Sequence, residues 1–186
     1  MKDVTFLVHV PHLWTSGNLL HAHELVRRVP PSNIEVGMVL QVLAIVVLGL
    51  ICGSELNVAA FAHPTLNRQP LDVHIPVRAS FARLFGKVMP LWMAASTLLN
   101  LLLLLPFEHL GVLAGHLAAV AFAIQVAAIL FSLVGPVPIN NRTKLWTPTN
   151  LPSNWRALER SWDLYHWIRT SALIVAFALL VVSALR

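Results

Sequence analysis

Four long apolar stretches dominate the pattern of hydrophobic and polar positions along the chain. They cover residues 36–61, 88–105, 111–134 and 164–185. Crossing a bilayer core of roughly 30 Å takes about 20 apolar residues in a helix, and each stretch is close to that length or longer. The pattern therefore predicts four transmembrane helices and leaves little of the chain for anything but their connections.

The connections between these stretches differ in length. A turn at residues 106–110 separates the second and third stretches, whereas the first connection (63–87) and the third (135–161) are long and contain several prolines. A turn this short joins antiparallel helices, so the sequence predicts an all-α, antiparallel four-helix membrane bundle. Residues 77–87 mix basic with aromatic and aliphatic side chains, which predicts an interfacial helix in the first long loop.

Composition agrees with a membrane protein. Of the 186 residues, 57% are hydrophobic and 11% charged, a balance that does not suit a water-facing surface. The excess of Lys and Arg lies in loops beside the apolar stretches, so it indicates orientation in a membrane and not nucleic-acid binding. Because positive residues favour the cytoplasm, both long loops are predicted to be cytoplasmic, in a protein integral to a bacterial inner membrane.

The domain prediction divides the chain at the start of the first apolar stretch. Residues 1–37 are interpreted as an amino-terminal extension, and residues 38–186 as the four-helix transmembrane domain. One hypothesis is that translation begins at Met38, where the apolar run starts. The sequence leaves open whether the bundle forms a homo-oligomer in the lipid bilayer.

Two ionisable residues lie within the predicted helices. Glu55 lies six residues before the end of the first stretch, and Arg169 lies six residues after Asp163, which precedes the fourth. At a rise of ~1.5 Å per residue both lie about 9 Å below the same membrane surface, and charged residues within a membrane normally face the bundle interior. We therefore expect Glu55 and Arg169 to meet, either as a structural ion pair or in a catalytic or ligand-binding site.

Aromatic and ionisable residues share one face of the fourth helix. Trp155, Trp162, His166 and Arg169 recur at spacings of seven, four and three residues, and Glu159 falls on the same face. An aromatic stripe of this kind is usually core or membrane-interface belt. The histidine and the arginine favour a site, because lipid-facing positions would not carry them.

Further polar residues lie near the same membrane surface. Asn140, Asn141 and Arg142 follow the third stretch and supply several hydrogen-bond donors; the alternative is a helix cap that anchors to lipid headgroups. His63 ends the first stretch at a similar level. Together with His166 and Glu55, this histidine offers ligands for a metal or a haem, but neither Glu-x-x-His nor His-x-x-x-His spacing is present. The sequence therefore predicts no metal and no cofactor.

These residues resemble those of the anthrone-oxygenase-like family, also catalogued as domain of unknown function 1772. The resemblance extends over residues 38–186 and rests mainly on residues 138–142, Trp146, residues 154–156, Trp162, His166 and Arg169. It implies an oxidoreductase that converts an anthrone to an anthraquinone with O₂ and without a cofactor.

The implied chemistry needs a base for an acidic C–H proton and donors for the resulting oxyanion. On this interpretation His166 is the base, and Glu55 or Asp163 orients it. The donors are Arg169, Asn140, Asn141 and Arg142. Trp155 and Trp162 stack against a flat, hydrophobic aromatic substrate, with His63 near them. The alternative is a non-enzymatic bundle that binds a lipid or a small molecule, or a subunit of a larger membrane complex.

Overall fold

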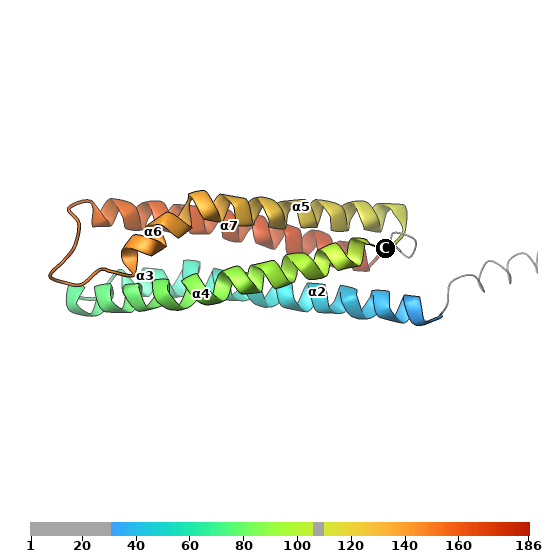
Figure 1. Cartoon of the computed structure of the whole chain (residues 1–186), viewed down its shortest axis with the longest axis horizontal. Helices are drawn as coiled ribbons and strands as arrows, with labels where there is room; N and C mark the ends of the chain where they lie inside the picture. The colour runs from blue at the N-terminus through green and yellow to red at the C-terminus, as the bar shows by residue number, and fades with distance from the viewer. Residues whose placement is uncertain (1–30, 106–109) are drawn as a thin grey trace, which may run out of the picture. The chain divides into compact units, whose positions relative to one another are not determined.

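The structure is a computed structural model that describes residues 31–105 and 110–186, and residues 37–186 form one compact unit. Its four long helices are α2 (Pro31–Asn57), α4 (Leu71–Leu104), α5 (Val112–Val134) and α7 (Trp155–Ala184), as Figure 1 shows. All four are long and apolar enough to cross a membrane. The predicted all-α membrane bundle is therefore confirmed.

Two shorter helices and a wide turn lie at one end of the bundle. Helix α2 continues through the π-helical turn η1 (Val58–Ala62) into α3 (His63–Leu66). Beyond α5, the chain forms α6 (Pro136–Thr143) before it reaches α7. In Figure 1, α3, α6 and the connection between α6 and α7 lie at the end opposite to the C-terminus.

Helix α4 differs most from the prediction. It begins at Leu71, so the segment 77–87 is its first half and not a separate interfacial helix in a long loop. The connection between α3 and α4 is only residues 67–70. At ~1.5 Å per residue the 34 residues of α4 measure about 51 Å, well beyond a bilayer core of roughly 30 Å. The first turns of α4 therefore extend past the hydrocarbon region.

The other predicted connections have mixed outcomes. The third loop, predicted at residues 135–161, contains α6 and the first turns of α7. Residues 106–109 lie outside the described residues, and with them most of the predicted turn between the second and third helices. Residues 1–30 also lie outside them, so the amino-terminal extension stays a prediction.

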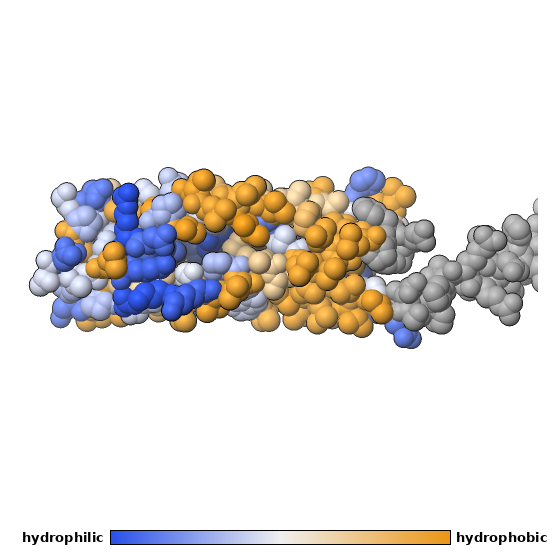
Figure 2. All heavy atoms as spheres, in the orientation of Figure 1, coloured by the Kyte–Doolittle hydropathy of each residue, from blue (hydrophilic) through white to orange (hydrophobic). Residues whose placement is uncertain are grey.

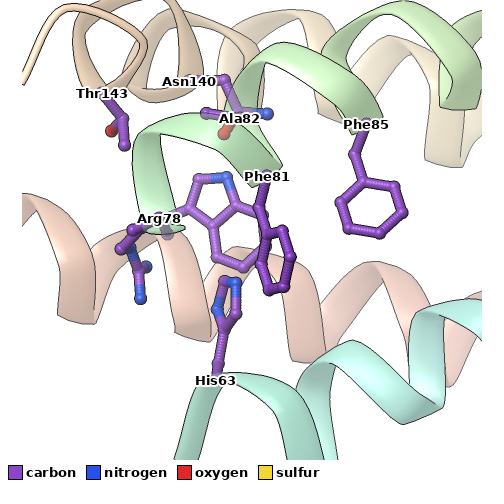
Figure 3. A pocket seen from close by; sticks show the side chains of 8 residues that line it. His63, Arg78, Phe81, Ala82, Phe85, Asn140 and Thr143 are labelled. Carbon is purple, nitrogen blue, oxygen red and sulfur yellow. The ribbon is translucent and has the colours of Figure 1, made fainter. Parts of the chain in front are cut away.

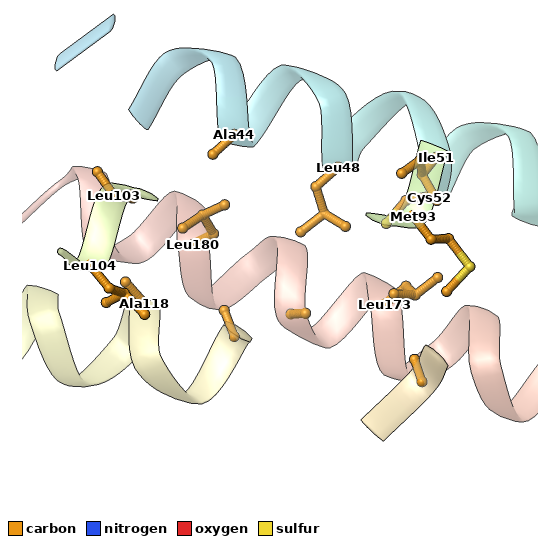
Figure 4. Close-up of a cluster of buried hydrophobic side chains, with 13 residues drawn as sticks. Ala44, Leu48, Ile51, Cys52, Met93, Leu103, Leu104, Ala118, Leu173 and Leu180 are labelled. Carbon is orange, nitrogen blue, oxygen red and sulfur yellow. The ribbon is translucent and has the colours of Figure 1, made fainter. Parts of the chain in front are cut away.

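An apolar core fills the half of the bundle away from α3 and α6. All four long helices contribute small and aliphatic side chains to it, as Figure 4 shows for Ala44, Leu48, Ile51, Cys52, Met93, Leu103, Leu104, Ala118, Leu173 and Leu180. Gly49 allows α2 to approach α7, because a Cβ there would lie 3.0 Å from the Phe177 ring. Small residues at such contacts are typical of packed membrane helices.

The surface divides between the two ends of the bundle. Hydrophilic atoms gather over the end formed by α3, α6 and the start of α7, and apolar atoms cover most of the remainder on the face drawn in Figure 2. This division is expected when one end reaches the membrane interface and the rest contacts lipid. The functional residues predicted from the sequence lie toward the polar end.

Candidate functional site

A buried ion pair joins α2 to α7. Glu55 is 1% exposed and Arg169 is 8% exposed. The guanidinium donates to Glu55 Oε2 from Nε at 3.2 Å and from Nη2 at 2.5 Å, and its Nη1 donates to Ser132 Oγ of α5 at 3.3 Å. The predicted contact between Glu55 and Arg169 is confirmed. Such pairing offsets much of the cost of burying two charges.

His166 lies one turn before Arg169 and completes this group. Its Nε2 donates to the backbone carbonyl oxygen of Glu55 at 3.0 Å, and its Nδ1 accepts from Arg169 Nη2 at 3.1 Å. These contacts fit a neutral imidazole with the proton on Nε2. Both ring nitrogens then bind the protein, so His166 holds the α2 backbone and the guanidinium together. We call Glu55, Ser132, His166 and Arg169 the Glu55 cluster.

The π-helical turn η1 sets the direction of the side chains at the end of α2. The His63 N–H donates to the carbonyl of Val58, five residues earlier. In an uninterrupted α-helix, residues eight apart differ by about 80° around the axis, which would turn His63 away from the face that holds Glu55. The wider turn absorbs an extra residue, and both side chains are buried in the bundle.

A cavity of about 150 Å³ lies beside the Glu55 cluster, and all four long helices and α6 contribute to its lining. Its polar lining includes the four residues of that cluster. The apolar walls come mainly from α4 and α5, with Phe85, Met89, Pro90, Met93, Ala94, Ile129 and Leu133. An apolar cavity with a few fixed polar groups is typical of small-molecule sites.

The cavity reaches the surface between α4 and α5. Pro90 and Ala94 of α4 and Leu133 of α5 line the cavity and are also exposed. Figure 2 shows the molecule hollowed at this place. The part of the rim that these two helices form is apolar.

A second polar part of the cavity lining comes from α6 and the residue that follows it. Asn140, Asn141 and Lys144 line the cavity there, and Lys144 Nζ donates to Asn141 Oδ1 at 2.9 Å. The lysine side chain passes close over Gly86 of α4, where a Cβ would lie 3.2 Å from Lys144 Cε. The Gly86 carbonyl lacks its usual helical donor, because the residue four positions later is Pro90, which has no N–H. Both residues line the cavity.

A second buried polar group connects the first turns of α4 and α7. Arg78 Nη2 donates to Asp163 Oδ1 at 3.0 Å, and its Nε lies 3.1 Å from Glu159 Oε1. Each carboxylate also accepts from a histidine, since His74 Nε2 donates to Glu159 at 2.5 Å and His63 Nδ1 donates to Asp163 at 3.1 Å. We call these five residues the Arg78 cluster.

Trp162 lies between the two clusters. Its ring stacks on His166, with centroids 4.6 Å apart and planes 13° apart, and the Arg78 guanidinium lies 5.4 Å from its centroid. Its Nε1 is buried and has no hydrogen-bond partner among the described residues, although a buried indole N–H normally finds one. Trp162 also lines a small space of about 20 Å³, and Figure 3 shows His63, Arg78 and Asn140 around this space.

The structure brings most of the predicted site residues to the large cavity. Those that line it are Glu55, Asn140, Asn141, Trp162, His166 and Arg169. Arg142 is exposed on α6 and is not part of the lining. Trp155 packs edge-on against His74 and Trp146 at the polar end, also away from the lining.

His63 and Asp163 line a different space. They belong to the Arg78 cluster and border a polar cavity of about 70 Å³ together with Asn67 and His166. Asp163 therefore orients His63 at 3.1 Å, whereas His166 is bound by Glu55 and Arg169. The aspartate does not have the position predicted for a residue that orients His166.

Sequence reasoning did not assign a role to five polar residues that the structure places in the two clusters or the large cavity. Three belong to the Arg78 cluster: His74, Arg78 and Glu159. The other two, Ser132 and Lys144, line the large cavity. The sequence did contain a signal for the Arg78 cluster. His74 and Arg78 are four residues apart, and so are Glu159 and Asp163, and this spacing places each pair on one face of its helix.

The described residues do not gather ligands for a metal ion. Within residues 31–105 and 110–186, no group of three or more His, Cys, Asp or Glu side chains is placed to hold one. The rings of His63 and His166 are 6.3 Å apart, and each donates to an oxygen of the protein.

The fold and the site define a class of protein: a helical membrane bundle with a cavity in which apolar walls meet a buried carboxylate, imidazole and guanidinium. Residues 79–179 match the family described as anthrone oxygenase. Because this match covers more than half of the chain, the protein belongs to the anthrone oxygenase family. No curated protein and no solved structure matches the chain.

Proposed function

We propose that the protein is a membrane oxygenase that converts a flat, hydrophobic phenolic substrate of the anthrone type to a quinone, with O₂ as oxidant and no cofactor. The observation that carries this proposal is the cavity of about 150 Å³ with the Glu55 cluster in its wall. Its apolar sides suit a fused-ring compound. Its buried charged groups suit the removal of an acidic proton and the stabilisation of the anion formed.

The proposed reaction balances without an additional reductant. A base removes a proton from the ring CH₂ group, and the resulting delocalised phenolate-type carbanion reduces O₂ and forms a C–O bond to it. The peroxide takes up a proton, then loses water as the second C–H bond breaks, and the carbon becomes a carbonyl. One CH₂ group and one O₂ thus give one C=O group and one water.

Glu55 is the base that the geometry favours. The contacts of its carboxylate within the described residues are made by Oε2, which leaves Oε1 for a ligand in the cavity. The sequence favoured His166, but a neutral His166 with both nitrogens bound to the protein has no lone pair for the substrate. In this proposal His166 positions Glu55 and Arg169, and Arg169 with Asn140 stabilises the oxyanion.

Two variants separate these assignments. Removal of a general base typically costs about 10²- to 10⁴-fold in turnover, so we expect Glu55→Gln to lose that much and His166→Asn to lose less. The assay supplies purified protein in detergent with emodin anthrone in air, with chelator present, and follows quinone absorbance against the spontaneous rate. Larger loss in His166→Asn than in Glu55→Gln would return the base role to His166. No acceleration by the wild-type protein over a range of phenolic substrates would contradict the oxygenase proposal and favour a non-enzymatic binding bundle.

The same proposal places the polar end of the bundle at the cytoplasmic face of a bacterial inner membrane. Basic residues support it, because Arg68, Arg83, Arg142, Arg156 and Arg160 lie at or near that end while Arg186 follows α7 at the other. Positive residues favour the cytoplasmic side. Single cysteines at Arg68 and Arg186, in a Cys52→Ala background, test this with a membrane-impermeant thiol reagent on intact cells. We expect labelling at position 186 only, and labelling at position 68 would reverse the orientation.

A further inference from the structure

We propose that the cavity binds an acidic oxygen of its fused-ring ligand at Lys144, so that the substrate is an aromatic acid that carries a carboxylate on an outer ring, while the reacting carbon belongs to the central ring. This inference names the substrate class of the proposed oxygenase and rests on that function for the fused-ring shape. Two independent observations at the cavity wall support it.

The first observation is the charge of Lys144. Glu55 in the cavity wall is paired with Arg169, and the carboxylates of Glu159 and Asp163 are paired with Arg78. Among the described residues, the hydrogen bond of the lysine ammonium goes to a neutral amide oxygen of Asn141. Lys144 therefore leaves the cavity with an uncompensated positive charge, which favours an anionic ligand group.

Contacts with α4 hold Lys144 beside the cavity. Its side chain crosses Gly86 at a distance that a larger residue would obstruct. Its backbone carbonyl accepts from Arg83 Nη1 at 2.8 Å, which ties the end of α6 to α4. The hydrogen bond from its ammonium to Asn141 is exposed, so this cation lies near the mouth of the cavity, where the acid group of a ligand would enter.

The second observation is the unpartnered donor of Trp162. This residue is 9% exposed and lines both the large cavity and the adjoining space of about 20 Å³, and its buried Nε1 has no partner among the described residues. A buried donor without a partner costs free energy, and a ligand oxygen would supply the missing acceptor. Asn140 lines the cavity as well and adds amide donors. The wall near α6 thus offers donors where the substrate would present oxygens.

This arrangement orients the ligand. With its acid group at Lys144, the rings lie against the apolar side chains of Met89, Met93 and Ile129, and the other end of the molecule reaches toward Glu55 and Arg169. The two polar parts of the cavity then have separate tasks. One binds the acid, and the other removes the proton from the reacting carbon.

The experiment compares two ligands of the same ring shape. Purified full-length protein in an uncharged detergent is titrated with anthracene-2-carboxylate and with anthracene-2-carboxamide, and ligand fluorescence reports binding. We expect the wild type to prefer the carboxylate. Lys144→Met should weaken carboxylate binding about tenfold, which corresponds to about 1.4 kcal/mol, and should leave carboxamide binding unchanged. Lys87→Met is the matched control, because Lys87 is an exposed lysine of α4 that does not line the cavity.

Trp162→Phe provides a second variant that keeps an aromatic ring and removes only the N–H. It should weaken binding of the carboxylate several-fold if that donor binds the ligand. Three outcomes would overturn the inference. They are equal affinity of the wild type for the two ligands, an equal loss of affinity for both in Lys144→Met, and no binding of either ligand.

A lipid headgroup carries the same anionic chemistry, so a further arm adds phosphatidylglycerol or phosphatidylcholine to the titration. If phosphatidylglycerol abolished the effect of Lys144→Met on carboxylate binding and phosphatidylcholine did not, Lys144 would be assigned to headgroup binding and the inference would be overturned.

Binding is measured without turnover, so the two proposals fail separately. A protein that binds the carboxylate through Lys144 but oxidises no substrate contradicts only the proposed function. One that oxidises neutral anthrones with no preference for the acid contradicts only this inference.

Discussion

The Glu55 cluster and the Arg78 cluster contain the same kinds of side chain, but they differ in what they face. Each combines acid, histidine and arginine, and α7 contributes to both. The Glu55 cluster borders a cavity of about 150 Å³. In the Arg78 cluster each carboxylate is shared between the arginine and a histidine, and the adjoining spaces are smaller, about 20 Å³ beside Arg78 and about 70 Å³ beside His63 and Asp163.

This difference separates a cluster suited to chemistry on a ligand from a cluster that stabilises the packing of the helices, a role that we call bracing. A polar network with every member paired fixes the positions of the helices that carry it, and the Arg78 cluster joins α3, α4 and α7 in this way. A site that acts on a ligand needs groups that are fixed but not all used within the protein, and it needs room beside them. The Glu55 cluster meets both conditions with Glu55 Oε1 and a cavity of about 150 Å³, whereas the spaces beside the Arg78 cluster are about 20 and 70 Å³.

The largest effect is expected from Arg169→Met. It leaves the Glu55 carboxylate, which is 1% exposed, without its partner. Breaking a buried ion pair by removing one member typically costs about 3–5 kcal/mol, so we expect a large fall in the free energy of unfolding together with loss of quinone formation. Unfolding in detergent followed by circular dichroism measures the first, and the emodin anthrone assay measures the second.

The double variant Glu55→Gln with Arg169→Met is the control for this prediction. It removes both charges, so stability should recover much of the loss while turnover should not return. A double variant that is as unstable as Arg169→Met would show that the cost comes from lost packing of the guanidinium and not from an unpaired carboxylate.

The contact between Glu55 and Arg169 could be predicted because helical rise fixes depth. Two residues equally far from the same membrane surface meet if both face the bundle interior, and their charge requires that. The four long helices were predictable for a similar reason, since apolar length reports the thickness of the bilayer. Both inferences need only local sequence and the geometry of one helix.

The first half of α4 was not predictable in this way. Its polar residues and Pro76 lie before the apolar stretch of residues 88–105. An apolar stretch indicates which part of a helix contacts lipid, and it does not indicate where the helix itself begins. The Arg78 cluster was missed with it, because His74 fell in a predicted loop and Arg78 in a helix predicted to lie at the membrane interface. The sequence also did not indicate which residues of α6 face the cavity. Asn140 and Asn141 line it, whereas the next residue, Arg142, is exposed and does not. Which residues of a short helix face inward depends on tertiary packing.

A smaller effect, confined to stability, is expected from Arg78→Met. The change removes one partner from Glu159 and one from Asp163, but His74 and His63 still donate to these carboxylates. Hydrogen bonds to charged groups typically contribute about 1.5–3 kcal/mol each, and Asp163 keeps partial exposure to water, with 29% of its side chain exposed. We therefore expect a loss near the lower end of that range, measured by the same unfolding experiment, with turnover per folded molecule close to that of the wild type.

This last variant is the sharper test of the comparison, because it disturbs a buried charged cluster without touching the cavity that the Glu55 cluster lines. Arg78 does not line that cavity, whereas Trp162, whose ring contacts both the Arg78 guanidinium and His166, does. If Arg78→Met abolished turnover while the unfolding transition stayed near that of the wild type, the second cluster would be part of the reacting site and the division between chemistry and bracing would be wrong. If it lowered stability alone, the same three residue types, arginine, acid and histidine, would differ in function because only the Glu55 cluster lines the large cavity.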